Sequence, residues 1–433
     1  MNLIKTFLRY VTTNIIGMIG ISCYILADTF FISKGLGANG LTSLNLSISI
    51  YSFIHATGLM IGIGAATRFS IYRAKNEQNK ANATFTNSIK IGILSGILFL
   101  IIGLFGSSIL SNLLGADKNT FAMTNIYLKT ILSFAPFFIL NNIFISFVRN
   151  DENPKLSMLG MLIGSFSNIF LDYIFIFTFK WGMFGAAFAT GLAPIISMSI
   201  LMIHYFKKKN NFHIQKSKLS IKQLIHDCSL GVSSFIAEIT SGIILIVFNL
   251  LILNQAGNTG VAAYGIVANL ALVATSIYTG IAQGTQPILS ENYGQGNNEK
   301  IRQLFKYAIS TSIFISVIMY ILVVIFNKPL VGIFNRDNVE TLSKIASRGL
   351  NLYFTGFFFA GINIIISASL SSINEPKHAY IISILRSGCI IVPLAILLSY
   401  FFGMTGIWIS FPLSEIITLI IGMYFGKNAQ QSL

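Results

Sequence analysis

The sequence predicts an all-α polytopic membrane protein with twelve transmembrane helices, arranged as two parallel six-helix repeats around a central cleft. Two observations support the membrane class. The 433 residues are 54% hydrophobic and only 10% charged, whereas a soluble protein of this size has about a quarter charged residues. The apolar residues also gather in runs of the length that a helix needs to cross a membrane, about 20 residues.

Twelve such runs follow one another, and each is expected to be one membrane span. The first six lie at 10–33, 41–66, 87–111, 124–147, 156–178 and 184–206. The second six lie at 228–254, 261–287, 306–327, 347–370, 379–401 and 406–426. The first run lacks a small-residue cleavage site and continues as one of many spans, so we expect no cleaved signal peptide.

The second six runs repeat the first six. FAPFF (134–138) recurs as FTGFF (354–358), NDENPK (150–155) as SINEPK (372–377), and GMFGAAFAT (182–190) as GMTGIWISF (403–411), in order and at a nearly constant distance. Because the repeat contains an even number of spans, both copies enter the membrane in the same direction. We therefore expect an N-terminal lobe at 1–206, a cytoplasmic inter-lobe loop at 207–227 and a C-terminal lobe at 228–433.

The net charge of +15 is distributed as a topology signal. Alternate connections are rich in Lys and Arg, whereas the segments 34–40, 255–260 and 402–405 hold only Lys34. Basic residues collect on the cytoplasmic side of membrane proteins. We therefore expect a multi-pass protein of the inner (plasma) membrane with both termini in the cytoplasm, and no nucleic-acid partner. Cys23, Cys228 and Cys389 have no metal-binding spacing and are expected to be small buried hydrophobic residues.

Four of the 14 acidic residues lie inside apolar runs: Asp28, Asp172, Glu238 and Glu415. A carboxylate at the centre of a bilayer costs about 2.5–3.5 kcal/mol on insertion scales. Ionisable groups at such positions are typical of proton or cation pathways. These acids therefore indicate ion-coupled transport.

Three helices of the N-terminal lobe bring oxygen-bearing side chains to a similar depth. Asp28 lies near the outer end of the first span, Asp172 in the outer half of the fifth, and Thr190 in the outer half of the sixth. Asn168 precedes Asp172 by one helical turn on the same face. These oxygens suit a small cation such as Na⁺, and two adjacent acids suit a bound proton equally well. Asp28 has an alternative partner in Lys34, and Asn168 and Thr190 could form ordinary interhelical hydrogen bonds.

The C-terminal lobe offers candidates for a substrate cleft. Glu238 and Glu415 lie near the middle of spans seven and twelve, and Gln283 is a third candidate on span eight. For Glu415 a static hydrogen bond within the lobe is favoured over a ligand. His55 in span two is favoured as a satisfied core histidine over a proton relay.

Enzyme motifs are absent from the sequence. It contains no DDxxD, HExxH, Walker loop or nucleophile elbow, and GQGN (294–297) is interpreted as a turn. Without a nucleotide site, an ion gradient is the expected energy source. We expect no cofactor apart from a coupling Na⁺ or H⁺.

Several segments resemble the multidrug and toxic compound extrusion family, in particular its bacterial branch. ADTFFISKGLGANGL (27–41) is similar to the end of the family's first helix, and SNIFLDYIFIF (167–177) with GMFGAAFAT (182–190) to its fifth and sixth helices. The most specific match is GIAQGTQPILSENYGQGNNEKIRQLF (280–305), which resembles the eighth helix and its loop. The resemblance covers essentially the whole chain and implies twin six-helix halves.

The resemblance also implies a role for individual residues. It implies that Asp28, Asn168, Asp172 and Thr190 form the family's cation site in the N-terminal lobe, and that Glu238 contributes to coupling. An acidic residue of the tenth helix in some relatives has no counterpart, because AGIN (360–363) stands there. Span one also lacks the proline at which that helix is proposed to bend in some relatives.

The sequence therefore predicts an antiporter that exports lipophilic organic cations by alternating access. We expect it to act as a monomer, with small organic cations and membrane lipids as its partners. A flippase for lipid-linked oligosaccharides is the alternative, which the acidic interior disfavours because a pyrophosphate needs a cationic cavity. A third interpretation is a membrane-embedded transferase without a recognisable motif.

Overall fold

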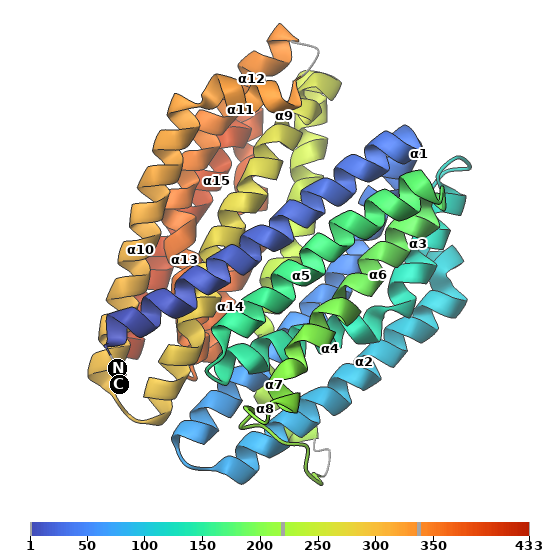
Figure 1. The fold of residues 1–433 in the computed structure, drawn as a ribbon. Helices are drawn as coiled ribbons and strands as arrows, with labels where there is room; N and C mark the ends of the chain where they lie inside the picture. The colour runs from blue at the N-terminus through green and yellow to red at the C-terminus, as the bar shows by residue number, and fades with distance from the viewer. Residues whose placement is uncertain (1, 218–220, 336–338, 433) are drawn as a thin grey trace.

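In the computed structural model, residues 2–217, 221–335 and 339–432 are described, and every element that they form is helical. Figure 1 shows two bundles. The first, the N-terminal half, contains α1 (Leu3–Ala74), α2 (Gln78–Leu113), α3 (Phe121–Ser133), α4 (Ala135–Asn150), α5 (Pro154–Tyr173), η1 (Ile174–Thr178), α6 (Gly182–Leu201) and α7 (Ile203–Phe206). The second, the C-terminal half, contains α9 (Val232–Gly294), α10 (Asn298–Ile325), α11 (Asn327–Phe334), α12 (Glu340–Tyr353), η2 (Phe354–Gly356), α13 (Phe357–Ser372), α14 (Pro376–Ile384), η3 (Leu385–Cys389) and α15 (Ile391–Ser432). The short helix α8 (Ile221–Ser229) precedes α9 in the chain and packs against α1 and α2.

The longest helices each contain two membrane spans that meet at a glycine. α1 breaks at Gly37, where φ is +69°, α9 at Gly257 (+61°) and α15 at Gly403 (+55°). Glycine adopts a positive φ at little cost because it has no Cβ. The chain therefore reverses at these points in a single residue, without a connecting loop.

The count of twelve spans is confirmed among the described residues. Eight helical stretches are long and apolar enough to cross a membrane, and α3 and α4, bent by 49°, together form a ninth. Pro136, near the start of α4, lies at this bend and has no N–H to donate. Three of the nine stretches contain a glycine break and so supply two spans each.

The parallel repeat is visible in the backbone as well as in the sequence. Positive φ angles recur at equivalent places in the two halves: Gly37 and Gly257, Asn76 and Gly296, Glu152 and Asn374, Gly182 and Gly403. Helix ends and breaks therefore follow the same order in both halves.

The segment after α7 is attached to the N-terminal half. The backbone N–H groups of His213 and Gln215 donate to Asn82 and Thr86 of α2 at 3.0 and 3.1 Å. Phe212 is buried against Phe85 and Phe147. Residues 207–217 of the expected inter-lobe loop therefore pack as part of the N-terminal half, residues 218–220 lie outside the described part of the chain, and α8 occupies the remainder.

The two halves pack tightly near one end of the molecule. We call this the terminal end, because it carries both chain ends and the turn between α1 and α2 (Figure 1). A Cβ on Gly284 of α9 would lie 2.7 Å from Val11 Cα of α1, so these backbones are in direct contact. Toward the opposite, distal end, Figure 1 shows the two halves moving apart.

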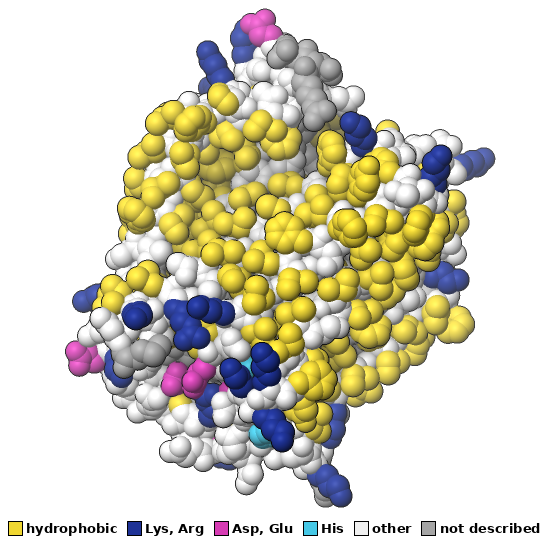
Figure 2. Space-filling view, in the orientation of Figure 1, with side chains coloured by type: hydrophobic (Ala, Val, Ile, Leu, Met, Phe, Trp, Pro, Cys, Tyr) yellow, Lys and Arg dark blue, Asp and Glu magenta, His cyan; other side chains and the backbone are white. Residues whose placement is uncertain are grey.

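The outer surface matches a membrane environment. Figure 2 shows hydrophobic side chains across the middle of the visible face and Lys and Arg side chains near its ends. Large apolar side chains such as Phe105 and Tyr400 are more than 80% exposed. Exposed apolar area on this scale is stable only in contact with lipid.

Candidate functional site

Asp28, Asp172, Asn168 and Thr190 lie together inside the N-terminal half, as the sequence predicted for their positions. Asp28 comes from α1, Asn168 and Asp172 from α5, and Thr190 from α6. All four are buried: Asp28 is 7% exposed, Thr190 is 4% exposed, and Asn168 and Asp172 are fully buried. The burial of both carboxyl groups removes them from lipid and from bulk water.

The two carboxyl groups lie within hydrogen-bonding distance of each other. One oxygen of each, Oδ1 of Asp28 and Oδ1 of Asp172, has no hydrogen-bond partner. Among the salt bridges of the described residues, none involves either acid, and the Lys34 ammonium lies over the Phe30 ring instead. Two buried acids in contact without a basic partner require a proton or a cation between them.

Asn168 and Thr190 complete this cluster. In the orientation that satisfies its amide, Asn168 donates to Asp172 Oδ2 at 3.1 Å and accepts from the Thr190 backbone N–H at 3.2 Å. The Thr190 hydroxyl donates to the Ala186 carbonyl at 3.0 Å. The four residues therefore form one connected group of oxygen atoms, which we call the acid cluster.

A π-helical turn follows the acid cluster directly. η1 begins at Ile174, two residues after Asp172. Such turns widen the helix and leave a backbone carbonyl without its ordinary partner, and they are frequent at functional sites. No motif in the sequence indicates this turn.

A cavity of about 70 Å³ adjoins the acid cluster, which leaves room for water. It reaches from Thr190 to His55 and is also lined by Tyr24, Tyr51, Asn141, Asn142 and Ser197. Two of its buried polar atoms, Asn141 Oδ1 and Ser197 Oγ, have no partner. The cluster is thus connected to a polar interior that the sequence analysis did not identify.

Glu238 lies at the junction between the two halves. Its Oε1 is 3.1 Å from Nδ1 of His55 on α1, and the two side chains are 32% and 23% exposed. Glu238 is therefore half-buried at the contact between the halves, and its role as a cleft residue stays a prediction. His55 is partnered, but it bridges the halves and does not lie in a core.

Glu415 and Gln283 are engaged within the protein. Glu415 is buried and accepts from Arg386 Nε at 3.0 Å and from Asn363 Nδ2 at 2.7 Å. This is the static hydrogen bonding that the sequence analysis favoured, so Glu415 does not line an open cleft surface. Gln283 accepts from Arg149 Nη1 at 2.7 Å across the interface between the halves.

Arg149 is the main residue that the sequence analysis missed. It is 1% exposed, and its Nη1 also donates to Asn14 Oδ1 at 3.1 Å, while its Nε and Nη2 have no partner. Nearby, Gln286 of α9 donates to Thr67 of α1 at 2.6 Å. By hydropathy, Arg149 lies just beyond the end of the fourth span. The sequence therefore does not show that its side chain is buried between the halves.

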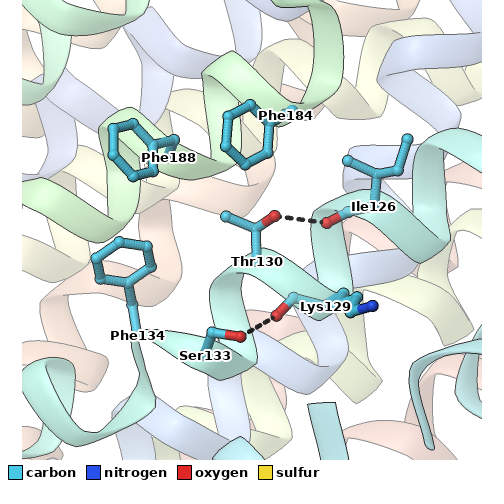
Figure 3. A pocket seen from close by; sticks show the side chains of 7 residues that line it. All are labelled: Ile126, Lys129, Thr130, Ser133, Phe134, Phe184 and Phe188. Atoms are coloured by element: carbon cyan, nitrogen blue, oxygen red, sulfur yellow. Dashed lines mark hydrogen bonds between the residues drawn. The ribbon is translucent and has the colours of Figure 1, made fainter. Parts of the chain in front are cut away.

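A larger groove of about 400 Å³ lies between α3 and α6 (Figure 3). Phe134, Phe184 and Phe188 line it together with apolar parts of α3. Its hydroxyl groups are already engaged, because Thr130 and Ser133 donate to carbonyls of α3. The groove contains no carboxylate and is separate from the acid cluster.

Comparisons with known proteins agree with this architecture. The family model MatE matches residues 14–174 and 233–397. The multidrug export protein MepA of Staphylococcus saprophyticus is 26% identical over 421 residues, which cover 97% of this chain and 92% of that protein, and MepA of Staphylococcus aureus gives the same values.

Solved structures show the same fold. A crystal structure of MATE in complex with MaL6 superposes with a TM-score of 0.94 at 22% identity, covering 100% of this chain and 97% of the other. The outward-facing conformation of a multidrug resistance MATE family transporter gives a TM-score of 0.93 at 23% identity with the same coverage. The predicted fold is therefore confirmed over the whole chain.

Proposed function

The chain belongs to the MatE family, and from that premise we propose that it exports lipophilic organic cations in exchange for Na⁺ or H⁺. The observation that carries this proposal is the acid cluster, in which Asp28 and Asp172 contact each other without a basic partner. Relatives with the name multidrug export protein align with almost the entire chain, which supports a small-molecule substrate.

The acid cluster would hold the coupling ion. If the ion is Na⁺, the carboxylates of Asp28 and Asp172, the amide oxygen of Asn168 and the hydroxyl of Thr190 supply oxygen ligands, which hard cations prefer. If the ion is H⁺, the two carboxyl groups share it. In both cases ion binding neutralises buried negative charge and changes which arrangement of the helices is most stable.

Export requires that the ion and the substrate oppose each other. Ion entry from the distal end would favour the state that releases substrate there. Linkage then requires substrate binding to weaken ion binding by the same factor. Glu238, which is partly exposed between the halves, is the carboxylate available to a cationic substrate.

We further propose that the terminal end faces the cytoplasm and that the protein lies in the plasma membrane. The basic connections, including Arg73, Lys75 and Lys80, lie at this end, which agrees with the positive-inside bias. A flippase for lipid-linked oligosaccharides is not favoured, because the N-terminal half holds two buried carboxyl groups without a basic partner and the half-buried Arg386 is already paired with Glu415.

Charge removal in the acid cluster tests the proposal. Asp28→Asn and Asp172→Asn should each reduce efflux of an organic cation from everted vesicles at least tenfold, because a neutral amide cannot bind the ion in exchange for substrate. Repeating the measurement without sodium at fixed pH distinguishes Na⁺ from H⁺ coupling.

Glu340→Gln serves as the matched control. Glu340 is 79% exposed and pairs with Lys344 of the same helix, so its replacement should leave efflux unchanged. Efflux by folded Asp172→Asn protein at the wild-type rate would refute the assignment of the acid cluster.

A further inference from the structure

The contact between His55 and Glu238 joins the two halves. His55 belongs to the second span of α1 and Glu238 to the first span of α9. Their side chains meet at 3.1 Å and both remain partly exposed. The contact is therefore held by a single interaction that water, protons or a ligand can reach.

His55 also borders the interior of the N-terminal half. Its ring stacks on Tyr51, with centroids 6.0 Å apart and planes 12° apart. The Tyr51 hydroxyl is 3.2 Å from that of Tyr24, which precedes Asp28 by one helical turn. The cavity beside His55 extends to Thr190 of the acid cluster. His55 thus lies between the cleft carboxylate and the acid cluster.

Charge around the pair is one-sided. Besides His55, the titratable groups that interact with Glu238 are Tyr24 and Tyr51 of α1. No Lys or Arg forms a salt bridge with Glu238 in the described part of the chain. Among the described residues, His55 is the one basic side chain that forms an ion pair with Glu238.

We propose that protonated His55 and the cationic substrate are alternative partners of Glu238, so that His55 is a specificity-determining residue of the substrate site. When His55 is protonated, its imidazolium neutralises Glu238 and a monovalent organic cation gains little by binding there. When His55 is neutral, Glu238 presents an uncompensated charge in a partly desolvated site, which favours a cation. This inference rests on the proposed function and adds the residue that determines when Glu238 is free to bind a cation.

The competition also has a structural consequence. A substrate that takes the place of His55 breaks the hydrogen bond that joins α1 to α9. Occupancy of the substrate site is then linked to the contact between the halves and, through Tyr51 and the cavity, to the side of α1 that carries Asp28. Imidazole is suited to this role because it changes charge between about pH 5 and pH 8.

Equilibrium binding of tetraphenylphosphonium to the purified full-length protein tests the proposal. The test uses an Asp172→Asn background, so that competition at the acid cluster does not contribute. Between pH 7.5 and pH 5.5 the Kd should rise about tenfold, because imidazole gains a proton in this range and the imidazolium then competes with the cation for Glu238. With His55→Gln added, the Kd should change less than twofold over the same pH range, because glutamine keeps a hydrogen-bond donor for Glu238 but does not titrate.

Two further variants complete the design. His55→Phe keeps the stacking on Tyr51 and should likewise abolish the pH dependence, which covers the case in which glutamine disturbs folding. His378→Gln is the matched control, because His378 forms a His–Glu contact of 3.2 Å with Glu375 on α14, away from the junction. In the His378→Gln variant, the Kd should still rise about tenfold between pH 7.5 and pH 5.5.

The outcomes separate the two proposals. An unchanged pH dependence after removal of the His55 imidazole overturns the competition while leaving organic-cation export intact. Absence of tetraphenylphosphonium binding to wild-type protein at pH 7.5 overturns the competition and counts against export of this substrate class as well. Loss of the pH dependence in the His55 variants alone supports the proposal.

Discussion

Among single residues, Asp227 on α8 is buried with neither carboxylate oxygen hydrogen-bonded. Burial raises the pKa of this carboxyl group from its ordinary 3.8 to about 7, although the Arg68 guanidinium lowers it in part. Arg68 itself donates to the His226 carbonyl at 3.4 Å and leaves its Nε unpartnered. This small group of polar residues lies where α8 packs against α1 at the terminal end.

The raised pKa of Asp227 has a direct consequence for stability. The folded protein binds this proton more tightly than the unfolded chain, so the contribution of Asp227 is most favourable at low pH and is lost as pH rises from about 4 to about 7. Asp227→Asn, which is never charged, should be more stable than wild type at pH 8 by about 1–3 kcal/mol.

Thermal unfolding in detergent measures this effect. The advantage of Asp227→Asn should shrink as the pH is lowered from 8 to 5, and Glu340→Gln, as an exposed control, should show no such trend. An advantage that is independent of pH would mean that folding does not raise the pKa of Asp227, and would contradict this account.

At the scale of helices, close contact between α1 and α9 depends on residues without a side chain. A Cβ on Gly284 would meet backbone atoms of Tyr10 and Val11 at 2.7–2.8 Å, and one on Gly231 would overlap the Met60 carbonyl oxygen. Backbone atoms cannot move aside as a flexible side chain can. The terminal end is therefore closed by surfaces that tolerate no added methyl group.

Gly284→Ala should consequently open the interface at the terminal end. We expect transport to fall at least tenfold, since the closed arrangement becomes strained. Cys228, which adjoins this interface, should react faster with a thiol reagent in protein whose Cys23 and Cys389 are replaced by serine. Gly242→Ala is the control, because a Cβ there meets no atom within 4 Å. Unchanged labelling and transport in Gly284→Ala would contradict this account of the interface.

The helices also show what could be predicted from the sequence. Hydropathy located all twelve spans, because an apolar run is a local property of the chain. It could not show that α1 and α9 continue through Gly37 and Gly257, or that α3 and α4 meet at an angle of 49°. α8 and α11 were missed because they are too short to cross a membrane.

For the candidate site, the neighbours within one half were predictable from the sequence, and the contacts between the halves were not. Depth within the spans predicted that Asp28, Asp172 and their neighbours would be close, because all four lie within one half. The contacts of Arg149 with Gln283 and of His55 with Glu238 join different halves. They depend on how two rigid bundles meet, which neither helical periodicity nor hydropathy encodes.

For the molecule as a whole, two similar halves meet at one end and diverge toward the other (Figure 1). Buried polar contacts such as Gln286 with Thr67 and Ser22 with Ser276 hold the closed end together. Exchange of one monovalent ion for one monovalent substrate moves no net charge across the membrane. A second coupling ion per cycle would add about 2.3 kcal/mol per 100 mV of membrane potential.

The central claim is that the acid cluster releases its ion when substrate binds, and the direct measurement is ion release from purified protein on addition of tetraphenylphosphonium. Proton release is followed with a pH dye in weak buffer, and Na⁺ release with radioactive sodium. We predict that wild-type protein releases one of these ions and that Asp28→Asn and Asp172→Asn release neither, because linkage requires an ion to be displaced. Equal release from wild type and both variants would contradict the account.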